Sequence, residues 1–323
     1  MANIIARIGV YGDIHLNSKN YGAHRDYPAE SLEYFTEITR VTREKQLTHL
    51  IGLGDFSFGR FHTLEYRLAV ERNLEEQFKL TQGNRFEIKG NHDAAGYGFT
   101  ERDYYVEKGL LRPSTNLQIG NLNLNMVDYG KTDTCTPIII DDDAHVNMIL
   151  AHDFFKFRDT PMANFGQAIE LDNYTNWFGV DYIVLGHVHK IMKFKGYIVK
   201  DSTVHETVVD YLGCMTRPSY RDGYMDEEGH MLIITVFDDG NIDIDTEIIK
   251  LWSLEDSFNL EVKQKQAEKK EEIEARVDIS DIVKQLDAHD RNVGNPEDII
   301  AGMEGIDEKY KNKAIDLLKS ALA

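Results

Sequence analysis

The sequence predicts an α/β fold with two β-sheets flanked by helices, followed by a helical C-terminal region. Three observations predict it. Strand and helix patterns alternate over residues 4–89, short strand patterns with hairpin turns fill residues 117–251, and the composition becomes strongly charged from about residue 254. A chain of 323 residues is long enough for one large domain and an appendage. We therefore expect a first domain over residues 1–253 and a helical region over residues 254–323.

The first part of the chain has the pattern of a parallel sheet. Apolar runs predict three strands and amphipathic stretches predict the two helices between them, at residues 4–11, 28–45, 47–53, 63–80 and 85–89 in chain order. Polar residues follow each strand. In such strand–helix–strand units the carboxyl ends of the strands share one edge of the sheet, where binding sites form.

The second part of the chain predicts a short helix near residues 101–108 and then mostly strands. Residues 117–127 alternate around Gly120-Asn121, and Asp238-Asp239-Gly240-Asn241 is a second hairpin turn. The other predicted strands cover residues 138–140, 146–150, 181–185, 197–199, 207–211, 231–237 and 242–251. We predict that these strands form a second, mainly antiparallel sheet.

The last part of the chain predicts helices without a large core. Residues 261–276 are nearly all Lys, Glu, Gln and Ala, which is typical of a solvated helix or helical linker stabilised by ion pairs one turn apart. Three short amphipathic stretches follow, and they predict a small helical appendage.

The charge balance limits the classes of partner. The chain has 36 basic and 55 acidic residues and a net charge of −19, which argues against broad attraction to nucleic acid or to an anionic membrane. A phosphate substrate remains compatible, because bound divalent metals can dominate the local field. No apolar run is long enough for a membrane helix, and the first residues predict a strand rather than a secretory signal. The two cysteines, Cys135 and Cys214, favour a reducing, cytoplasmic setting.

Side chains that can bind metal follow five of the predicted strands. They are Asp13 with His15, Asp55, Asn91 with His92, His152, and His187 with His189. Imidazoles, carboxylates and an amide suit divalent cations such as Mn, Fe or Zn. With His92 set aside, seven candidate ligands exceed the needs of one tetrahedral ion, so two ions that share a bridging carboxylate fit the count better. One such residue alone would more often cap a turn, but the five motifs together favour a metal site.

The five motifs, Asp-x-His, Gly-Asp, Gly-Asn-His-Asp, a single His and Gly-His-x-His, resemble those of the calcineurin-like metallophosphoesterases, in the same order over residues 13–189. The resemblance implies that family's four-layer fold, a two-sheet β-sandwich flanked by helices. It also implies two divalent metal ions, with Mn as the first expectation and Fe, Zn or Mg as the others. In this family a metal-bridging hydroxide hydrolyses a phosphoester.

The resemblance also implies a role for each site residue. The ligands would form one set for each ion and a bridge between them. These are Asp13, His15 and His189 for the first ion, Asn91, His152 and His187 for the second, and Asp55 as the bridge. His92 would stabilise the pentacovalent state or protonate the leaving oxygen. Asp93 would orient His92, as carboxylates commonly do for functional imidazoles.

A second resemblance concerns the substrate. Tyr211-Leu212-Gly213-Cys214-Met215, followed by Arg217 and Arg221, resembles the strand after the last motif in SbcD-like DNA-repair nucleases, where a Ser commonly stands at the position of Cys214. It implies a DNA exo- or endonuclease whose C-terminal helices bind an SMC-like ATPase. The second motif, residues 54–58, lacks the Arg of the protein Ser/Thr phosphatases. The nuclease is therefore the preferred prediction.

Two alternatives stay open. The negative charge favours a small-molecule phosphodiesterase, for example one acting on cyclic nucleotides, because a nuclease acting alone would be expected to carry a basic groove. The C-terminal region would then be an oligomerisation element, for example in a homodimer. A non-catalytic binding module on the same scaffold is the third reading, and the intact His92 and the full ligand set disfavour it.

Overall fold

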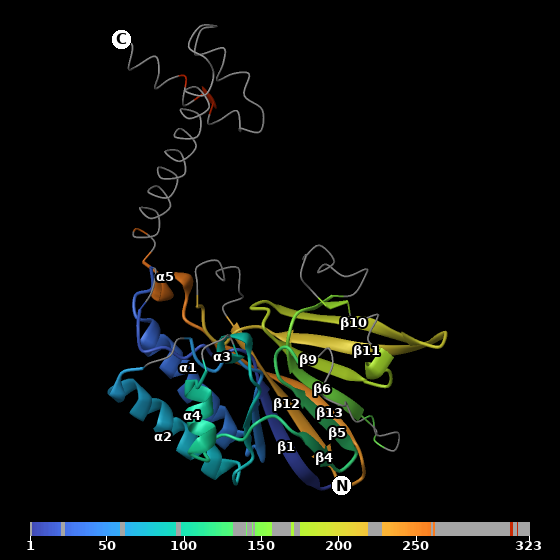
Figure 1. Ribbon diagram of the computed structural model, residues 1–323. Coiled ribbons are helices and arrows are strands. Elements are labelled where there is room, and N and C mark those ends of the chain that lie inside the picture. Colours follow the sequence, from blue (N-terminus) through green and yellow to red (C-terminus); the bar gives the residue numbers. More distant parts are fainter. Residues whose placement is uncertain are drawn as a thin grey trace, which may run out of the picture. The chain divides into compact units, whose positions relative to one another are not determined.

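The computed structural model describes residues 2–20, 23–58, 62–94, 98–131, 140, 144, 146–156, 169–170, 175–218, 228–259, 261, 311–312 and 315. The chain divides into two compact units, Met1–Phe258 and Asn259–Ala323. The first unit contains two mixed sheets with helices beside the first of them (Figure 1). No helix among the described residues is long and apolar enough to cross a membrane.

The first sheet has the strand order β13-β12-β1-β2-β3. Its parallel part consists of β1 (Ile4–Tyr11), β2 (His49–Gly52) and β3 (Arg85–Glu87), and the antiparallel edge consists of β12 (Glu228–Phe237) and β13 (Ile242–Lys250). The predicted helices at residues 28–45 and 63–80 are confirmed as α1 (Tyr27–Glu44) and α2 (Leu64–Leu80).

Local sequence sets the start of both long helices. The Asp26 carboxylate accepts a hydrogen bond from the Ala29 backbone N–H, and Pro28 occupies the first turn of α1. The Thr63 hydroxyl caps α2 in the same way. The shorter α4 (Glu101–Glu107) begins with a complete capping box at Thr100 and Asp103. These capping groups satisfy N–H donors that have no partner inside the helix.

The second sheet has the order β10-β11-β9-β6-β5-β4. Its four inner strands are parallel, and a hairpin closes each edge. The strands are β4 (Asn116–Ile119), β5 (Leu122–Val127), β6 (Val146–His152), β9 (Tyr182–Gly186), β10 (Ile191–Lys200) and β11 (Thr203–Leu212). A separate pair of short strands, β7 (Phe155–Lys156) and β8 (Ile169–Glu170), is parallel.

The predicted composition of the second sheet was wrong in two respects. The strands predicted at 231–237 and 242–251 belong to the first sheet, where Ile233 pairs with Gly9. The inner strands of the second sheet are parallel rather than antiparallel. A turn pattern identifies a hairpin but not the sheet edge that the hairpin joins, and this one joined the open edge of β1. Of the strand predicted at 138–140, only Ile140 lies within the described residues, and it is not in a strand.

The core lies between the two sheets and between the first sheet and its helices. Ile8, Ile51 and Leu232 of the first sheet pack with Leu124 and Leu150 of the second. On the other face of the first sheet, Tyr11 and Leu50 pack with residues of α1 and α2, among them Phe35 and Leu74. These layers place the ends of strands from both sheets at a common site.

The short helix α5 (Leu254–Ser257) belongs to the first unit. The Ser257 hydroxyl donates a hydrogen bond to the buried Glu30 carboxyl group over 2.9 Å, and the Arg217 guanidinium donates to the Ser257 hydroxyl over 3.2 Å. The Phe258 ring lies 4.4 Å from the His24 ring, centroid to centroid. The first unit therefore ends five residues beyond the boundary predicted at residue 253.

Candidate metal centre

The structure brings all seven predicted ligands together where strands of both sheets end. Each lies in or directly after a strand, as its motif suggests. Asp13 and His15 follow β1, Asp55 follows β2, Asn91 begins the short α3 (Asn91–Ala94) after β3, His152 ends β6, and His187 and His189 follow β9. The site therefore draws on five strands that are far apart in the sequence.

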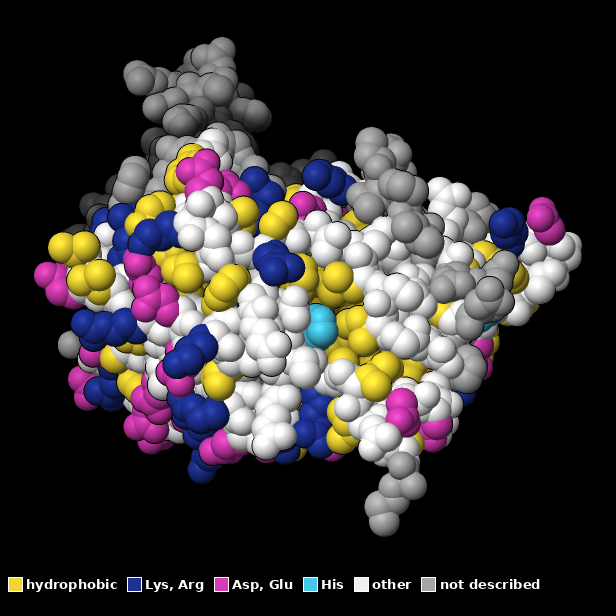
Figure 2. Space-filling model, turned by 90° about the horizontal axis from the view of Figure 1, so that it is seen from below, with side chains coloured by type: hydrophobic (Ala, Val, Ile, Leu, Met, Phe, Trp, Pro, Cys, Tyr) yellow, Lys and Arg dark blue, Asp and Glu magenta, His cyan; other side chains and the backbone are white. Residues whose placement is uncertain are grey.

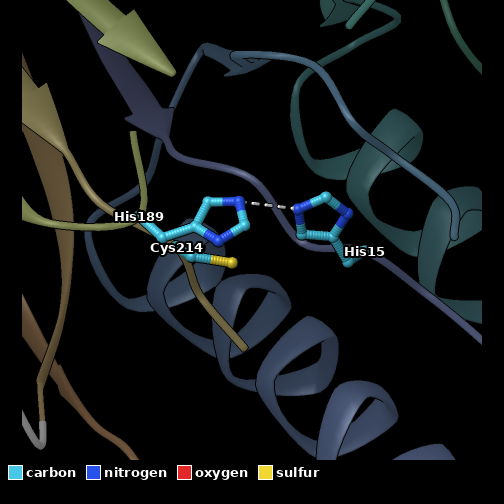
Figure 3. Close-up of side chains that lie close together, drawn as sticks. All are labelled: His15, His189 and Cys214. Atoms are coloured by element: carbon cyan, nitrogen blue, oxygen red, sulfur yellow. Dashed lines mark hydrogen bonds between the residues drawn. The ribbon is translucent and has the colours of Figure 1, made fainter. Parts of the chain in front are cut away.

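One group of ligands contains Asp13, His15 and His189. The Nε2 atoms of His15 and His189 lie 3.0 Å apart, and Figure 3 shows the two ring nitrogens facing each other. An Asp13 carboxylate oxygen lies 3.4 Å from His189 Nε2 and 4.0 Å from His15 Nε2. Asp13 and His15 are fully buried. Two facing imidazole nitrogens beside a carboxylate are a natural place for a cation.

A second group contains Asn91, His152 and His187. The Asn91 side-chain oxygen lies 2.8 Å from His152 Nε2 and 2.8 Å from His187 Nδ1. The other nitrogen of His152, Nδ1, lies 2.8 Å from the backbone oxygen of Leu53. A proton on Nδ1 satisfies that carbonyl and leaves the Nε2 lone pair directed at the site, as in many metal-binding histidines.

Asp55 lies between the two groups. One of its carboxylate oxygens is 3.8 Å from His15 Nε2 and 3.4 Å from His152 Nε2. The other oxygen accepts a hydrogen bond from the His92 backbone N–H over 2.8 Å. A single carboxylate therefore reaches both groups and is fixed by the loop that carries His92.

The two buried carboxylates dominate the electrostatics of the site. Burial would lower the pKa of His152, but Asp55 and Asp13 outweigh it and raise that pKa to about 9. Burial lowers the pKa of His15 to about 4 and also lowers that of His187. Burial would raise the pKa values of Asp13 and Asp55, but the neighbouring histidines, His152 foremost, lower both overall. A pKa of about 9 means that the His152 ring holds both protons at neutral pH, and a cation that binds beside the ionised carboxylates would take the place of the Nε2 proton.

The backbone is held in unusual conformations around the ligands. Three of them have positive φ although they are not glycine, with φ of 47° at His15, 49° at Asp55 and 76° at His187. Such residues cost roughly 1–3 kcal/mol each and concentrate at functional sites. The glycine before Asn91 permits a close approach, because a Cβ atom on Gly90 would lie 2.2 Å from the Asp55 backbone nitrogen.

His92 and Asp93 point in different directions. His92 is exposed at the edge of the site, where its ring lies 4.8 Å from the Phe58 ring and 5.3 Å from the His15 ring. Asp93 is buried, and one of its oxygens accepts hydrogen bonds from the backbone N–H groups of Gly90 (3.1 Å) and Phe56 (3.2 Å). Burial, with the nearby Asp55, raises the pKa of Asp93 to about 7.

The structure does not show the predicted hydrogen bond between Asp93 and His92. Within the described part of the chain, the second Asp93 oxygen has no hydrogen-bond partner. The two residues follow each other in α3, and successive side chains on a helix point about 100° apart. Asp93 therefore ties the loop after β3 to the loop after β2.

Four further residues lie near the predicted ligands, although the sequence patterns did not predict their positions. The Cys214 sulfur and the ligand nitrogens of His15 and His189 all lie within 4.8 Å of one another. Phe58 contacts His92 as described, the Tyr129 ring lies 6.0 Å from the His187 ring, and the Phe154 ring lies 6.5 Å from it. Their sequence positions give no signal, because each reaches the site through a loop or through a distant strand.

The donor set fits two divalent cations. Nitrogen and oxygen atoms from seven side chains converge, and one carboxylate reaches both groups. Metal–nitrogen distances of about 2.0–2.1 Å place two ligands of one ion roughly 3 Å apart, which is the spacing of the His15 and His189 nitrogens. When bound, such ions act as Lewis acids and make water nucleophilic near neutral pH.

The chain is similar to known proteins at the level of a family model and of solved structures. The family model described as calcineurin-like phosphoesterase matches residues 6–191. Among solved structures, a dimetal phosphatase from Danio rerio is similar at 10% identity and a TM-score of 0.45, covering 77% of this chain and 100% of that one. Vps29 from Chaetomium thermophilum is similar at 10% identity and a TM-score of 0.34, covering 76% and 98%.

No curated protein sequence matches the chain significantly. The family match spans more than half of the chain and includes all five motifs. The two mixed sheets with flanking helices are the α/β sandwich that the resemblance implied. The chain belongs to the calcineurin-like phosphoesterase family, whose members use a dinuclear metal centre.

Proposed function

We propose that this phosphoesterase cleaves phosphodiesters and that its substrate is DNA, as in the SbcD-type nucleases. The observation that carries the proposal is the exposed His92 imidazole at the edge of the buried ligand cluster. An imidazole that is accessible to solvent and close to the ligands can meet the leaving oxygen of a bound ester. Its role is to protonate that oxygen or to stabilise the charge that develops on the phosphoryl group.

The other site residues act by holding position. We propose that the two ligand groups each hold one ion and that Asp55 bridges them. The His92 backbone N–H fixes the Asp55 carboxylate, so the same loop positions the bridge and the imidazole. Asp93 fixes that loop by accepting hydrogen bonds from the Gly90 and Phe56 backbone N–H groups. The backbone of this loop thus positions the His92 imidazole relative to the two proposed ions. This arrangement does not need a carboxylate that is hydrogen-bonded to the His92 ring.

Aromatic rings next to the ligands support an ester that carries a nucleobase. Phe58 contacts His92 on the side of the first group, and Tyr129, which is 38% exposed, lies beside His187 on the side of the second. Bases stack on aromatic rings in a sequence-independent way, worth about 1–3 kcal/mol each. DNA and cyclic nucleotides share this feature, so the rings favour nucleotide esters over other phosphodiesters.

The charge of the chain supports the second candidate, a small-molecule phosphodiesterase. On the face seen in Figure 2 the described Lys and Arg side chains are scattered among acidic ones. Arg217, one of the two basic residues that follow the nuclease-like strand motif, is fully buried and donates hydrogen bonds to Ser257 and to the Trp252 backbone. It is therefore not available to a DNA backbone. A nuclease of this composition would need a basic surface from a partner.

The remaining assignments are also proposals. We propose two divalent metal ions, with Mn as the first expectation and Fe, Zn or Mg as alternatives, and the nitrogen and oxygen donors of the second ligand group suit Mn. The nuclease assignment includes an SMC-like ATPase as partner of the C-terminal helices, and the phosphodiesterase assignment includes a homodimer. The low cysteine content continues to favour a cytoplasmic setting.

One assay separates the candidates. The full chain is loaded with Mn and given single-stranded DNA, double-stranded DNA, 2′,3′- and 3′,5′-cyclic nucleotides and an aryl phosphodiester. Cleavage of DNA at rates well above those for cyclic nucleotides supports the nuclease, and the reverse order supports the small-molecule enzyme. If metal-loaded protein cleaves none of these diesters, the phosphodiesterase proposal is wrong.

A further inference from the structure

Cys214 is held against the metal-binding loop by the main chain. Cys214 and Asp13 form a parallel β-bridge, and the Met215 backbone N–H donates a hydrogen bond to the Asp13 carbonyl over 2.7 Å. A Cβ atom on Gly12 would lie only 2.0 Å from the Gly213 carbonyl oxygen, so the two segments are in close contact. The position of Cys214 relative to the first ligand group therefore follows from the fold.

The thiol lies next to the ligands of the first group. Its sulfur and the ligand nitrogens of His15 and His189 lie within 4.8 Å of one another. Figure 3 shows the Cys214 side chain beside the His189 ring, with its sulfur on the side of His15. The thiol is buried and lies 3.1 Å from the Asp13 carbonyl oxygen, to which it donates a hydrogen bond.

We propose that Cys214 supplies a sulfur donor to the ion held by Asp13, His15 and His189. With the bridging Asp55, this ion would have two imidazoles, two carboxylates and a thiolate, all donor types that Zn²⁺ accepts, whereas sulfur disfavours Mg²⁺ and Mn²⁺. Metal–sulfur and metal–nitrogen bonds of about 2.3 Å and 2.0–2.1 Å place ligand atoms roughly 3.3–3.7 Å apart. The His15 and His189 nitrogens are already 3.0 Å apart, and the sulfur, which lies within 4.8 Å of both, would move toward them on binding.

The chemistry of binding is simple. The thiol loses its proton to solvent, and its hydrogen bond to the Asp13 carbonyl is exchanged for a metal–sulfur bond. The first position then selects Zn²⁺, Fe²⁺ or Co²⁺, while the second position keeps nitrogen and oxygen donors. The inference rests on the metal centre of the proposed function and is independent of which ester is cleaved.

If the Cys214 sulfur only packs in the core and does not bind the metal, the effect of substituting Cys214 is different. In that case a Ser side chain, which has nearly the same shape and can make the same hydrogen bond to the Asp13 carbonyl, replaces Cys214 without effect on the metal. The substitution Cys214→Ser therefore separates packing from ligation. Cys135, the other cysteine of the chain, provides the matched control Cys135→Ser.

X-ray absorption at the zinc edge tests the inference on the unaltered chain. We expect a sulfur scatterer at about 2.3 Å in the Zn-loaded protein. In the Co²⁺-loaded protein we expect a near-ultraviolet sulfur-to-cobalt charge-transfer band that Cys135→Ser retains and Cys214→Ser loses. Competition between Zn²⁺ and Mn²⁺ should show the preference for Zn²⁺ falling by about tenfold or more in Cys214→Ser, the scale on which neighbours of metal ligands act.

Two results would overturn the inference. One is a zinc shell of nitrogen and oxygen alone in the unaltered chain, and the other is a charge-transfer band that survives Cys214→Ser. The absorption measurement needs no variant, so it decides even if Cys214→Ser fails to fold. A nitrogen- and oxygen-only shell in protein that still cleaves a diester removes the sulfur ligand and leaves the proposed function intact.

Discussion

At the scale of single residues, the adjacent residues His92 and Asp93 have different roles, because one side chain faces solvent and the other is buried. The His92 side chain faces solvent, while its backbone N–H holds Asp55. A substitution of the His92 side chain therefore leaves the backbone bond and the ligands in place. The two functions of this residue can be separated by experiment.

We predict that His92→Ala keeps both metal ions and loses turnover by about a hundredfold to ten-thousandfold, the usual contribution of a general acid. Elemental analysis and initial rates on an aryl phosphodiester measure the two quantities on the same sample. An equal loss in metal content and rate would show that His92 is needed to build the site rather than to catalyse.

Substitution of Asp93 should affect stability rather than catalysis directly. Asp93→Ala leaves the buried Gly90 and Phe56 N–H groups without their acceptor, which should lower the free energy of unfolding by about 2–4 kcal/mol. Asp93→Asn keeps an oxygen that can accept both bonds and should retain most of that stability and the metal. Urea unfolding compares the two variants. If Asp93→Asn is as stable as the unaltered chain but slow, the result supports the orienting role that the family resemblance implies.

The convergence of the seven predicted ligands could be expected from sequence, because each is a metal-binding residue type close behind an apolar strand. The role of Asp93 was harder, because the motif does not give the direction of its side chain. Cys214 could not be placed, because its distance from His15 depends on the pairing of the segment after β11 with the segment after β1. Such a contact joins positions 201 residues apart, and no local pattern encodes it.

At the scale of elements, the loops after the strands must pass very close to one another. Gly90 does not have a positive φ, so a side chain there meets only a steric obstacle, the Asp55 backbone and carboxylate at 2.2 Å. We predict that Gly90→Ala lowers stability by about 1–3 kcal/mol and weakens metal binding, because Asp55 has to move. Metal titration by calorimetry measures the loss.

Gly109 offers the matched control. It has a φ of 75° and open space around an added Cβ atom. Gly109→Ala should cost about 1–2 kcal/mol through backbone conformation alone and leave metal affinity unchanged. Equal loss of metal affinity in both variants would mean that general destabilisation, rather than the contact with Asp55, is responsible.

The buried contact between α1 and α5 should make stability depend on pH. Burial raises the pKa of Glu30 to about 7, against an ordinary value of 4.5. Between pH 4.5 and 7 the folded state therefore keeps a proton that the unfolded state has lost. The stability that this proton contributes is complete below pH 4.5, and it declines by about 3 kcal/mol in total as the pH rises past 7. Glu30→Gln should flatten the change in melting temperature between pH 5 and 8. The exposed Glu65 of α2 does not act on Glu30 and is the control, so Glu65→Gln should leave the change as it is.

Sequence patterns identified the two long helices and most strands, since amphipathic periods and capping residues are local. They failed on the sheet to which β12 belongs. Its apolar pattern fits either sheet, and only the free edge of β1 determines the choice. The parallel order of β5, β6, β9 and β11 likewise depends on connections whose course the strand patterns do not reveal.

At the scale of the whole molecule, the end of the first unit determines what can be removed. The unit includes α5 and Phe258, which contact Glu30, Arg217 and His24. We predict that a chain ending at Phe258 keeps its metals and its rate on an aryl phosphodiester, because every described ligand and His92 lie within it. Cleavage of DNA by the shortened chain, compared with the full chain, reports whether residues 259–323 contribute to a macromolecular substrate.

A chain ending at Ser253 is the informative counterpart, since it removes α5 and Phe258 as well. It leaves the Glu30 carboxyl group and the Arg217 guanidinium buried without the Ser257 hydroxyl that joins them. Loss of such a partner inside a protein costs about 1–3 kcal/mol, so this chain should unfold at a lower temperature and at lower urea than the one ending at Phe258. Equal stability of the two chains would place the boundary of the catalytic unit at residue 253. If the chain ending at Phe258 folds but no longer cleaves the aryl diester, the C-terminal region is part of the catalytic machinery.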